Sequence, residues 1–221
     1  MLEIIAMTVE DAKRIEAGGG QRIELVSALS EGGLTPSYGL IKKVCESVTI
    51  PVNVIIRPHS KGFVYPPEEI EVIAQDILMA KKLGANGVVI GVLNPDNTID
   101  FKALEQLLEL CGGLDVTFHR AIDELADIPT ATAQLAAYPQ ITNILTSGGL
   151  AQPIEKNTAV LRAAHRQKGD INILLGGGLN LENVAKIKEE SGATDFHFGS
   201  AVRTDGEIDV EKIKKIRGII G

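Results

Sequence analysis

The chain has 221 residues, of which 44% are hydrophobic, and its formal net charge is −7. This length suits one barrel-sized core better than two domains. The negative charge and the scattered basic residues argue against nucleic acid and anionic membranes as partners. No apolar run approaches the roughly 18 residues that would span a bilayer. Because the first residues lack a signal-peptide pattern, we expect a cytoplasmic protein.

Eight short aliphatic runs recur along the chain, each followed by a polar or glycine-rich junction and then a helical pattern. We predict strands over residues 2–5, 23–26, 52–56, 87–90, 116–118, 143–145, 172–175 and 195–198. This alternation predicts an α/β fold, a (β/α)8 TIM barrel that forms a single domain over residues 1–221. In such barrels the functional site lies where the strands end, so the strand-to-helix junctions are the places to examine.

Local signals predict where several helices begin. Thr8 is placed to cap the first helix, with Asp11 three positions later, and Asn180 is placed to cap the seventh. The pair Pro66-Pro67 opens the third helix, whose acidic start and basic end suit the helix dipole. The two longest junctions, 27–37 and 57–67, both follow strands, and their length makes them candidate lids.

Alternation along the strands predicts that many polar side chains point into the barrel. The large apolar residues share the face that must cover the helices. The inward set is Glu3, Glu24, Asn53, Arg57, Thr117, His119, Asn172, Asp195 and His197. Because burying unpaired polar groups is costly, this composition indicates a ligand site. A structural alternative is that the groups satisfy one another, for example Glu24 with Arg57, and Glu3 fits a structural role best.

His119 ends the fifth strand and is followed by Arg120 and Asp123 in the segment TFHRAID. A histidine beside a carboxylate has a fixed tautomer and a raised pKa, which suits proton transfer or anion binding near neutral pH. We therefore expect His119, oriented by Asp123, to act as an acid or base, with Glu24 as a second proton-transfer group.

Glycines occupy the two junctions where many barrels hold a phosphate on backbone amides. Gly176, Gly177 and Gly178 follow the seventh strand, and Gly199 with Ser200 follows the eighth. These residues are candidate anion ligands, although tight turns alone would also explain the glycines.

The two cysteines, Cys45 and Cys111, fall on the apolar stripes of separate predicted helices. We expect both to be buried structural thiols without a disulfide.

Several segments together form a specific pattern that spans almost the whole chain, among them RIELVSALSEGGLTPS (22–37), IPVNVIIRP (50–58), DVTFHRAID (115–123) and SGATDFHFGSA (191–201). With these segments the chain resembles the CutC family, whose members are called copper homeostasis proteins. The resemblance implies a TIM barrel, a cytoplasmic location, a homodimer or larger homo-oligomer, and copper, as Cu(I), as the bound species. It also implies shared site residues, namely Glu24, Arg57, His119, Arg120, Asp123, Ser147 and His197.

The predicted rim does not resemble a Cu(I) site, because Cu(I) prefers thiolate and thioether ligands. Cys45 and Cys111 are the only cysteine candidates for Cu(I), and using Cys45 requires a buried thiol to open or a subunit interface to supply a second ligand. Three functions therefore remain open. They are a protein that binds or handles Cu(I), an enzyme acting on a small phosphorylated or carboxylated metabolite, and a barrel that has lost its chemistry. In the enzyme, Arg57 and Arg120 would hold the anion.

Overall fold

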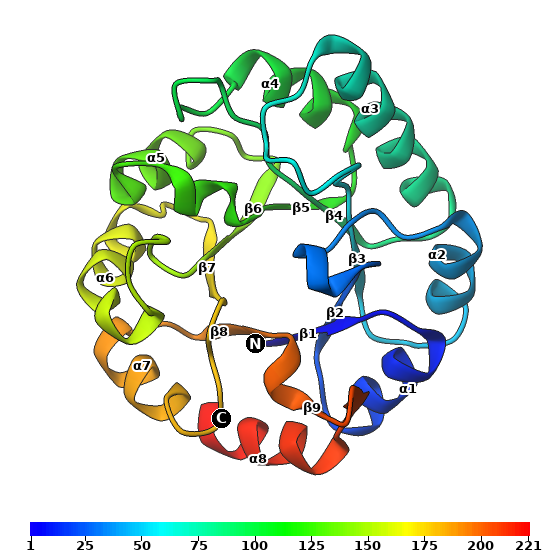
Figure 1. The fold of residues 1–221 in the computed structure, drawn as a ribbon, viewed down its shortest axis with the longest axis vertical. Helices are drawn as coiled ribbons and strands as arrows, with labels where there is room; N and C mark the ends of the chain where they lie inside the picture. Colours follow the sequence, from blue (N-terminus) through cyan, green and yellow to red (C-terminus); the bar gives the residue numbers. More distant parts are fainter.

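The computed structural model describes residues 1–221 and contains a closed barrel of eight parallel strands in chain order, with β8 beside β1 (Figure 1). The strands are β1 (Leu2–Ala6), β2 (Arg22–Leu25), β3 (Val52–Ile55), β4 (Gly87–Ile90), β5 (Asp115–Phe118), β6 (Ile141–Thr146), β7 (Asn172–Leu175) and β8 (Asp195–Phe198). The predicted TIM barrel is confirmed, and every strand was located to within about two residues of its ends.

Eight helices surround the barrel (Figure 1). They are α1 (Val9–Ala17), α2 (Tyr38–Cys45), α3 (Pro67–Lys82), α4 (Phe101–Leu110), α5 (Ile128–Leu135), α6 (Thr158–Gln167), α7 (Val184–Ser191) and α8 (Val210–Ile220). Short 3-10 turns, η1 (Leu29–Glu31), η2 (Arg120–Glu124), η3 (Ile154–Lys156) and η4 (Ser200–Val202), and a small hairpin of β9 (Arg203–Thr204) and β10 (Glu207–Ile208) lie in the connections. None of the helices combines the length and the apolar character that crossing a membrane requires.

The predicted helix starts are largely confirmed. The Thr8 hydroxyl accepts a hydrogen bond from the Asp11 amide at 3.0 Å, and α3 begins at Pro67. The seventh helix differs, because α7 begins at Val184 and the Asn180 side chain instead accepts from the amides of Glu182 and Asn183 in the turn before it. The short Asn side chain satisfies an isolated turn as readily as a helix end.

Alternation along the strands separates an apolar layer from a polar interior. Phe118, Phe196 and Phe198 are fully buried between the strands and the helices, within one continuous core. Two of the predicted inward residues lie elsewhere, because they are the first residues of their strands and so sit at the opposite end of the barrel. Asn172 is exposed, and Asp195 pairs with the Met1 amino group at 2.9 Å.

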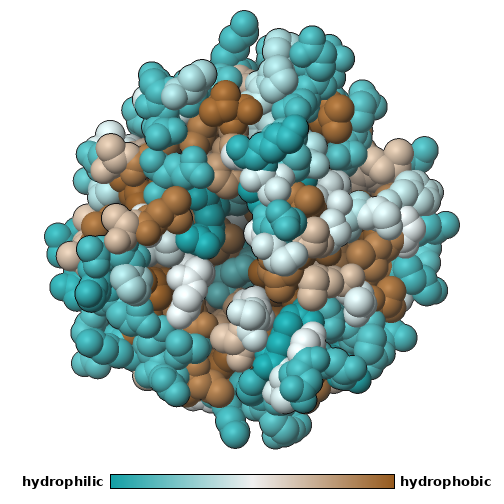
Figure 2. Space-filling model, in the orientation of Figure 1, coloured by the Kyte–Doolittle hydropathy of each residue, from teal (hydrophilic) through white to brown (hydrophobic).

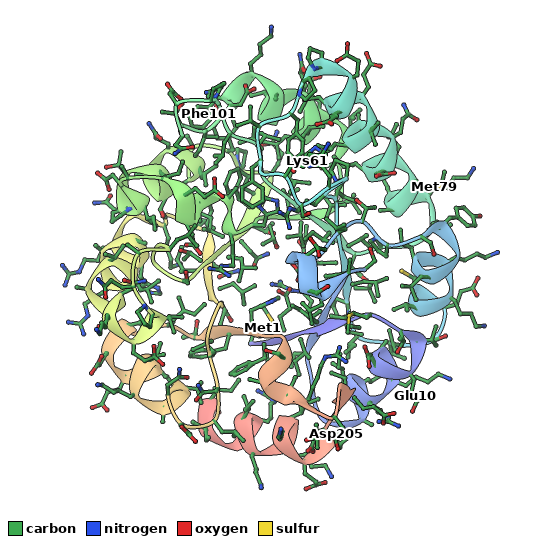
Figure 3. All side chains as sticks on the ribbon, viewed as in Figure 1. Met1, Glu10, Lys61, Met79, Phe101 and Asp205 are labelled. Carbon is green, nitrogen blue, oxygen red and sulfur yellow. The ribbon has the colours of Figure 1, made fainter.

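The mouth at the carboxyl ends of the strands is hollowed, and both hydrophilic and hydrophobic residues surround it (Figure 2). The long connection between β3 and α3 runs beside this mouth, and Lys61 marks it in Figure 3.

Candidate functional site

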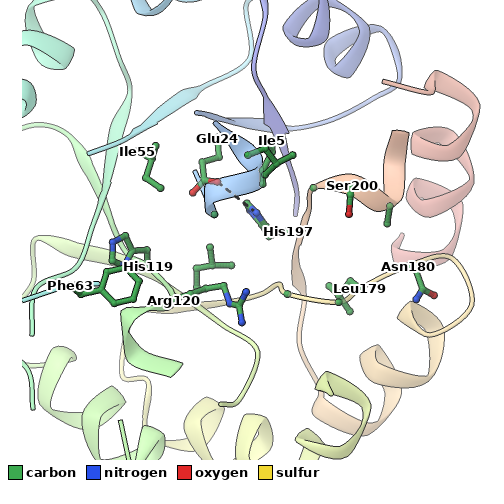
Figure 4. Close-up of a pocket in the computed structure, with 17 residues that line it drawn as sticks. Ile5, Glu24, Ile55, Phe63, His119, Arg120, Leu179, Asn180, His197 and Ser200 are labelled. Atoms are coloured by element: carbon green, nitrogen blue, oxygen red, sulfur yellow. Dashed lines mark ion pairs between the residues drawn. The ribbon is translucent and has the colours of Figure 1, made fainter. Parts of the chain in front are cut away.

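A cavity of ≈ 540 Å³ opens at the carboxyl ends of the strands (Figure 4). Its lining includes residues from β1, β2, β3, β6 and β8 and from five strand-to-helix junctions. Eight predicted site residues line it: Glu24, His119, Arg120, Gly177, Gly178, His197, Gly199 and Ser200. The remaining predicted residues, Arg57, Asp123, Ser147 and Gly176, lie behind this lining rather than in it. Parallel strands therefore bring together groups that are up to 176 positions apart in the sequence.

Beneath the cavity, a buried charge network crosses the barrel. Arg22 on β2 donates from Nε to Glu3 on β1, and its Nη1 approaches Asn143 Oδ1 on β6 at 3.4 Å. His197 on β8 lies with Nδ1 2.7 Å from the second oxygen of Glu3. Burial raises the pKa of Glu3, but Arg22 and His197 outweigh it and hold that pKa below its ordinary value. Glu3 is thus a structural carboxylate that orients Arg22 and His197, as expected.

Glu24 faces the cavity above this network and has a different environment. Its carboxyl group is buried, makes no hydrogen bond within the protein, and lies 3.7 Å from Nε2 of His197 (Figure 4). Burial raises the pKa of Glu24 to about 7, and the negative charge of Glu3 adds to this effect. Burial lowers the pKa of His197, but Glu24 and Glu3 outweigh it, and the net shift is upward. Glu24 and His197 therefore form an acid–base pair in which Glu24 has a pKa of about 7 and the pKa of His197 lies above its ordinary value.

His119 does not pair with Asp123, and that prediction is wrong. Its Nδ1 accepts a hydrogen bond from the Ala121 amide at 3.2 Å, and its ring packs against Phe63 with centroids 4.8 Å apart. Burial lowers the pKa of His119 to about 3, and the positive charges of Arg57 and Arg120 add to the shift. The predicted upward shift is also wrong, because no carboxylate offsets the cost of burying a charged imidazole.

Asp123 instead orients Arg120. The Arg120 Nε donates to Asp123 Oδ2 at 2.8 Å, and its Nη2 donates to the Ser147 hydroxyl at 3.2 Å. Asp123 also accepts from the Ser147 amide and from the Thr146 hydroxyl, so both of its carboxylate oxygens are engaged. Asp123 and Ser147 are therefore positioning residues behind the guanidinium, and Nη1 of Arg120 remains without a protein partner.

The glycine junction after β7 lies directly against this guanidinium. Gly177 and Gly178 have φ of +84° and +105°, which side-chain-bearing residues rarely adopt, and a Cβ on Gly177 would lie 2.7 Å from Arg120 Cζ. The amides of Gly177, Gly178 and Gly199 make no hydrogen bond within the protein. Gly176 sits below, where a Cβ would meet Leu145 at 2.7 Å. Unpaired amides beside a fixed guanidinium are typical of an anion site.

Arg57 neither pairs with Glu24 nor lines the cavity. Its Nη1 donates to the carbonyl oxygens of Glu31 and Gly33 at 2.9 and 3.2 Å, and its guanidinium lies 4.9 Å from the centre of the Phe63 ring. The side chain thus ties together the two long junctions, 27–37 and 57–67. Its role as an anion ligand stays a prediction, because loop carbonyls occupy Nη1 whereas Nε is buried without a hydrogen-bond partner.

No arrangement in the cavity resembles a thiolate metal site. Glu3, Glu24 and His197 offer ligand atoms within 4.8 Å of one another, but Glu3 is already engaged by Arg22 and by His197. Both cysteines are free. Cys111 is buried, as expected, whereas Cys45 is only half-buried, so its predicted burial is wrong. The two thiols belong to α2 and the end of α4, with α3 between them (Figure 1).

Sequence reasoning missed Arg22 and Asn143 as members of the interior. The signal was present, because Arg22 precedes Glu24 by two residues and Asn143 precedes Leu145 by two, so each pair shares a strand face. Neither residue was recognised, because the stagger of the barrel decides how deep in the interior the first residue of β2 and the third residue of β6 lie.

Comparison with known proteins gives a consistent result. The model of the CutC family matches residues 1–203. A copper homeostasis protein cutC homolog from Homo sapiens is 43% identical over 205 residues, which are 93% of this chain and 75% of that protein. A family protein CutC from Bacteroides thetaiotaomicron is 38% identical over 96% of this chain and 86% of its own length.

Comparison with solved structures agrees with the match to the CutC family. A crystal structure named as a copper homeostasis protein CutC from Streptococcus agalactiae has a TM-score of 0.86 at 34% identity, over 92% of this chain and 100% of that one. A phosphoribosyl anthranilate isomerase from Thermococcus kodakaraensis reaches a TM-score of 0.69 over 99% of this chain and 97% of that one, but at 17% identity it shows the shared barrel fold alone. The chain belongs to the CutC family.

Proposed function

We propose that this protein is an enzyme that binds a small phosphorylated or carboxylated metabolite at the barrel mouth and transfers a proton on it. The observation that carries the proposal is Glu24, a largely buried residue whose carboxyl group makes no hydrogen bond in the protein, opens onto the cavity and lies 3.7 Å from His197. A purely structural interior would pair this carboxyl group with protein donors, so Glu24 speaks against a barrel that has lost its chemistry.

The anion would lie against Arg120 and the amides of Gly177, Gly178 and Gly199. Asp123 and Ser147 hold the guanidinium in one orientation, so little side-chain entropy is lost when it binds a ligand. The backbone amides supply donors that need no reorganisation. This arrangement suits a phosphate or a carboxylate and repels a cation.

The proton would move between the metabolite and Glu24, with His197 adjusting the charge of the pair. A pKa near 7 leaves Glu24 able to accept a proton and to return it at neutral pH. Glu3 fixes the orientation of His197 from below, because Nδ1 of His197 is engaged by the Glu3 carboxylate. Only Nε2 of the histidine therefore faces Glu24.

Two measurements test the proposal. Calorimetric titration with inorganic phosphate should show binding that Arg120→Gln abolishes and that Arg14→Gln, at a partly exposed arginine of α1 outside the cavity lining, leaves unchanged. Incubating mixtures of phosphorylated and carboxylated metabolites with the protein in D₂O should exchange a carbon-bound proton of at least one compound, as seen by ¹H NMR, and Glu24→Gln should prevent it. No phosphate binding together with no exchange would refute the proposal.

Cu(I) handling is the second candidate, and we propose it on the names of the curated relatives and on the half-buried thiol of Cys45. Burial raises the pKa of both thiols, that of Cys111 to about 11, which disfavours the thiolate that Cu(I) binds. A second copy of the chain would have to supply another sulfur ligand. Free thiols suit a reducing compartment, so we place either activity in the cytoplasm. An anaerobic Cu(I) competition titration tests this candidate, which fails if affinity is negligible or is unchanged in Cys45→Ser and Cys111→Ser.

A further inference from the structure

The hydrogen bonds of His119 determine which of its ring nitrogens carries the proton. Nδ1 accepts from the Ala121 amide at 3.2 Å, because His119 caps the first turn of η2. A nitrogen that accepts a hydrogen bond carries no proton, so in the neutral ring the proton resides on Nε2. His119 therefore presents an N–H donor rather than a basic nitrogen.

This donor has no partner in the protein. Nε2 is buried without a hydrogen bond, while the ring lines the cavity. The edge that carries Nδ1 and Cε1 lies against Gly91, where a Cβ would come within 2.4 Å of the ring. The glycine directly after β4 thus makes room for the imidazole, and Phe63 packs on the face of the ring. An unpaired buried donor is costly and is kept where a ligand satisfies it.

The groups around the cavity define what this donor would meet. Glu24 with His197 lies across the cavity from His119, and Arg120 occupies a third side (Figure 4). Arg57 and Arg120 are the charged groups nearest the His119 ring, and both oppose its protonation. A neutral imidazole donor can stabilise an oxyanion in the transition state without giving up its proton.

We propose that the substrate is a small phosphorylated or carboxylated carbonyl compound, whose carbonyl oxygen accepts a hydrogen bond from His119 Nε2–H while Glu24 removes a proton from the adjacent carbon. This inference rests on the proposed function and deepens it. The electron pair of the broken C–H bond forms a C=C bond, and the π pair of the carbonyl moves to oxygen as an enolate. Where the adjacent carbon carries a hydroxyl group, the protonated Glu24 delivers its proton to the former carbonyl carbon, the hydroxyl proton passes to the enolate oxygen, and the hydroxyl oxygen becomes the new carbonyl. The class of reaction is an isomerisation between an α-hydroxy aldehyde and an α-hydroxy ketone, which needs no oxidant, reductant or co-reactant.

The tautomer can be tested without a substrate. Long-range ¹H–¹⁵N correlation spectra of the ¹⁵N-labelled protein should show His119 as the neutral Nε2–H form from pH 5 to pH 8. Spectra of His119→Gln assign the signal. A protonated ring in this range, or a proton on Nδ1, would overturn the inference.

Ligand binding tests the substrate class with two probes that share a phosphate. 2-Phosphoglycolate places an oxyanion where the enolate would form, whereas glycerol 3-phosphate does not. The protein should bind 2-phosphoglycolate about tenfold or more tightly than glycerol 3-phosphate, as one hydrogen bond to a charged group predicts. His119→Asn keeps an acceptor for the Ala121 amide but removes the distal donor, and should abolish the preference while leaving glycerol 3-phosphate binding unchanged. His119→Gln restores a donor and should recover part of the preference.

The outcomes separate this inference from the proposed function. Equal affinity for both probes, or a preference that survives in His119→Asn, would overturn the role of His119 while leaving the anion site intact. Binding of neither probe, nor of inorganic phosphate, would overturn the proposed function and this inference together.

Discussion

Replacing Glu24 by glutamine should make the protein more stable, and the gain should grow with pH. The substitution keeps the shape of the side chain and removes its ionisation. Below pH 4.5, the ordinary pKa of the group, the carboxyl is protonated in both the folded and the unfolded chain. As the pH rises, the unfolded chain releases the proton first, whereas the folded protein retains it up to about pH 7. Stability from this group is therefore lost as the pH rises toward 7.

The size of the effect follows from the two pKa values. The shift from 4.5 to about 7 corresponds to about 3 kcal/mol, fully expressed only above the folded-state value. Between pH 5 and pH 8, the difference in free energy of unfolding between Glu24→Gln and the parent protein should increase by about 2–3 kcal/mol. The folded-state pKa of about 7 already includes the attraction of His197, which holds the pKa of Glu24 below the value that burial alone would produce. No separate correction for His197 is therefore added to the free-energy difference.

Urea denaturation followed by circular dichroism at several pH values measures the effect. Urea is chosen over guanidinium because it is uncharged and does not screen the site. Glu109→Gln, at an exposed position of α4, is the matched control, and its difference in free energy of unfolding from the parent protein should be the same at every pH. Parallel curves for Glu24→Gln as well would refute the claim that Glu24 is held near neutrality by burial.

Three further predictions concern other parts of the structure. Arg22→Met should cost about 3–5 kcal/mol in urea denaturation, because it removes the guanidinium from a fully buried Glu3 carboxylate and leaves His197 as its remaining partner. Adding Glu3→Gln should recover most of the loss, and a loss that the second change does not relieve contradicts the pairing. Gly177→Ala should lower phosphate affinity by about tenfold, because the new Cβ would displace the guanidinium of Arg120. The control is Gly206→Ala, which has the same φ of +84° but no atom within 4 Å of its new Cβ, and it should leave phosphate affinity unchanged. Cys45 should be alkylated by iodoacetamide in the native protein while the thiol at the end of α4 reacts only after unfolding, as peptide mass spectrometry would show; equal rates would contradict the difference in burial.

The fold was readable from sequence because its signals are local. Short apolar runs alternate with helical patterns, and the spacing of hydrophobic residues within each segment determines whether it forms a strand or a helix. Parity along the strands correctly separated Phe196 and Phe198 from His197, and the rule that barrel sites lie at the carboxyl ends of strands pointed to Glu24, His119 and the glycine junctions. These inferences need only the direction of a side chain relative to its own strand.

The pairing of those side chains was decided by the tertiary structure. Sequence proximity suggested that Asp123 would orient His119, yet Asp123 binds Arg120 and Ser147, and a backbone amide takes Nδ1 of the histidine. The distances that matter join different strands, and the stagger of the barrel, which no local pattern encodes, determines which groups meet. Burial then decides the chemistry, because the same low-dielectric interior raises the pKa of Glu24 and lowers that of His119 according to the charges that surround each group.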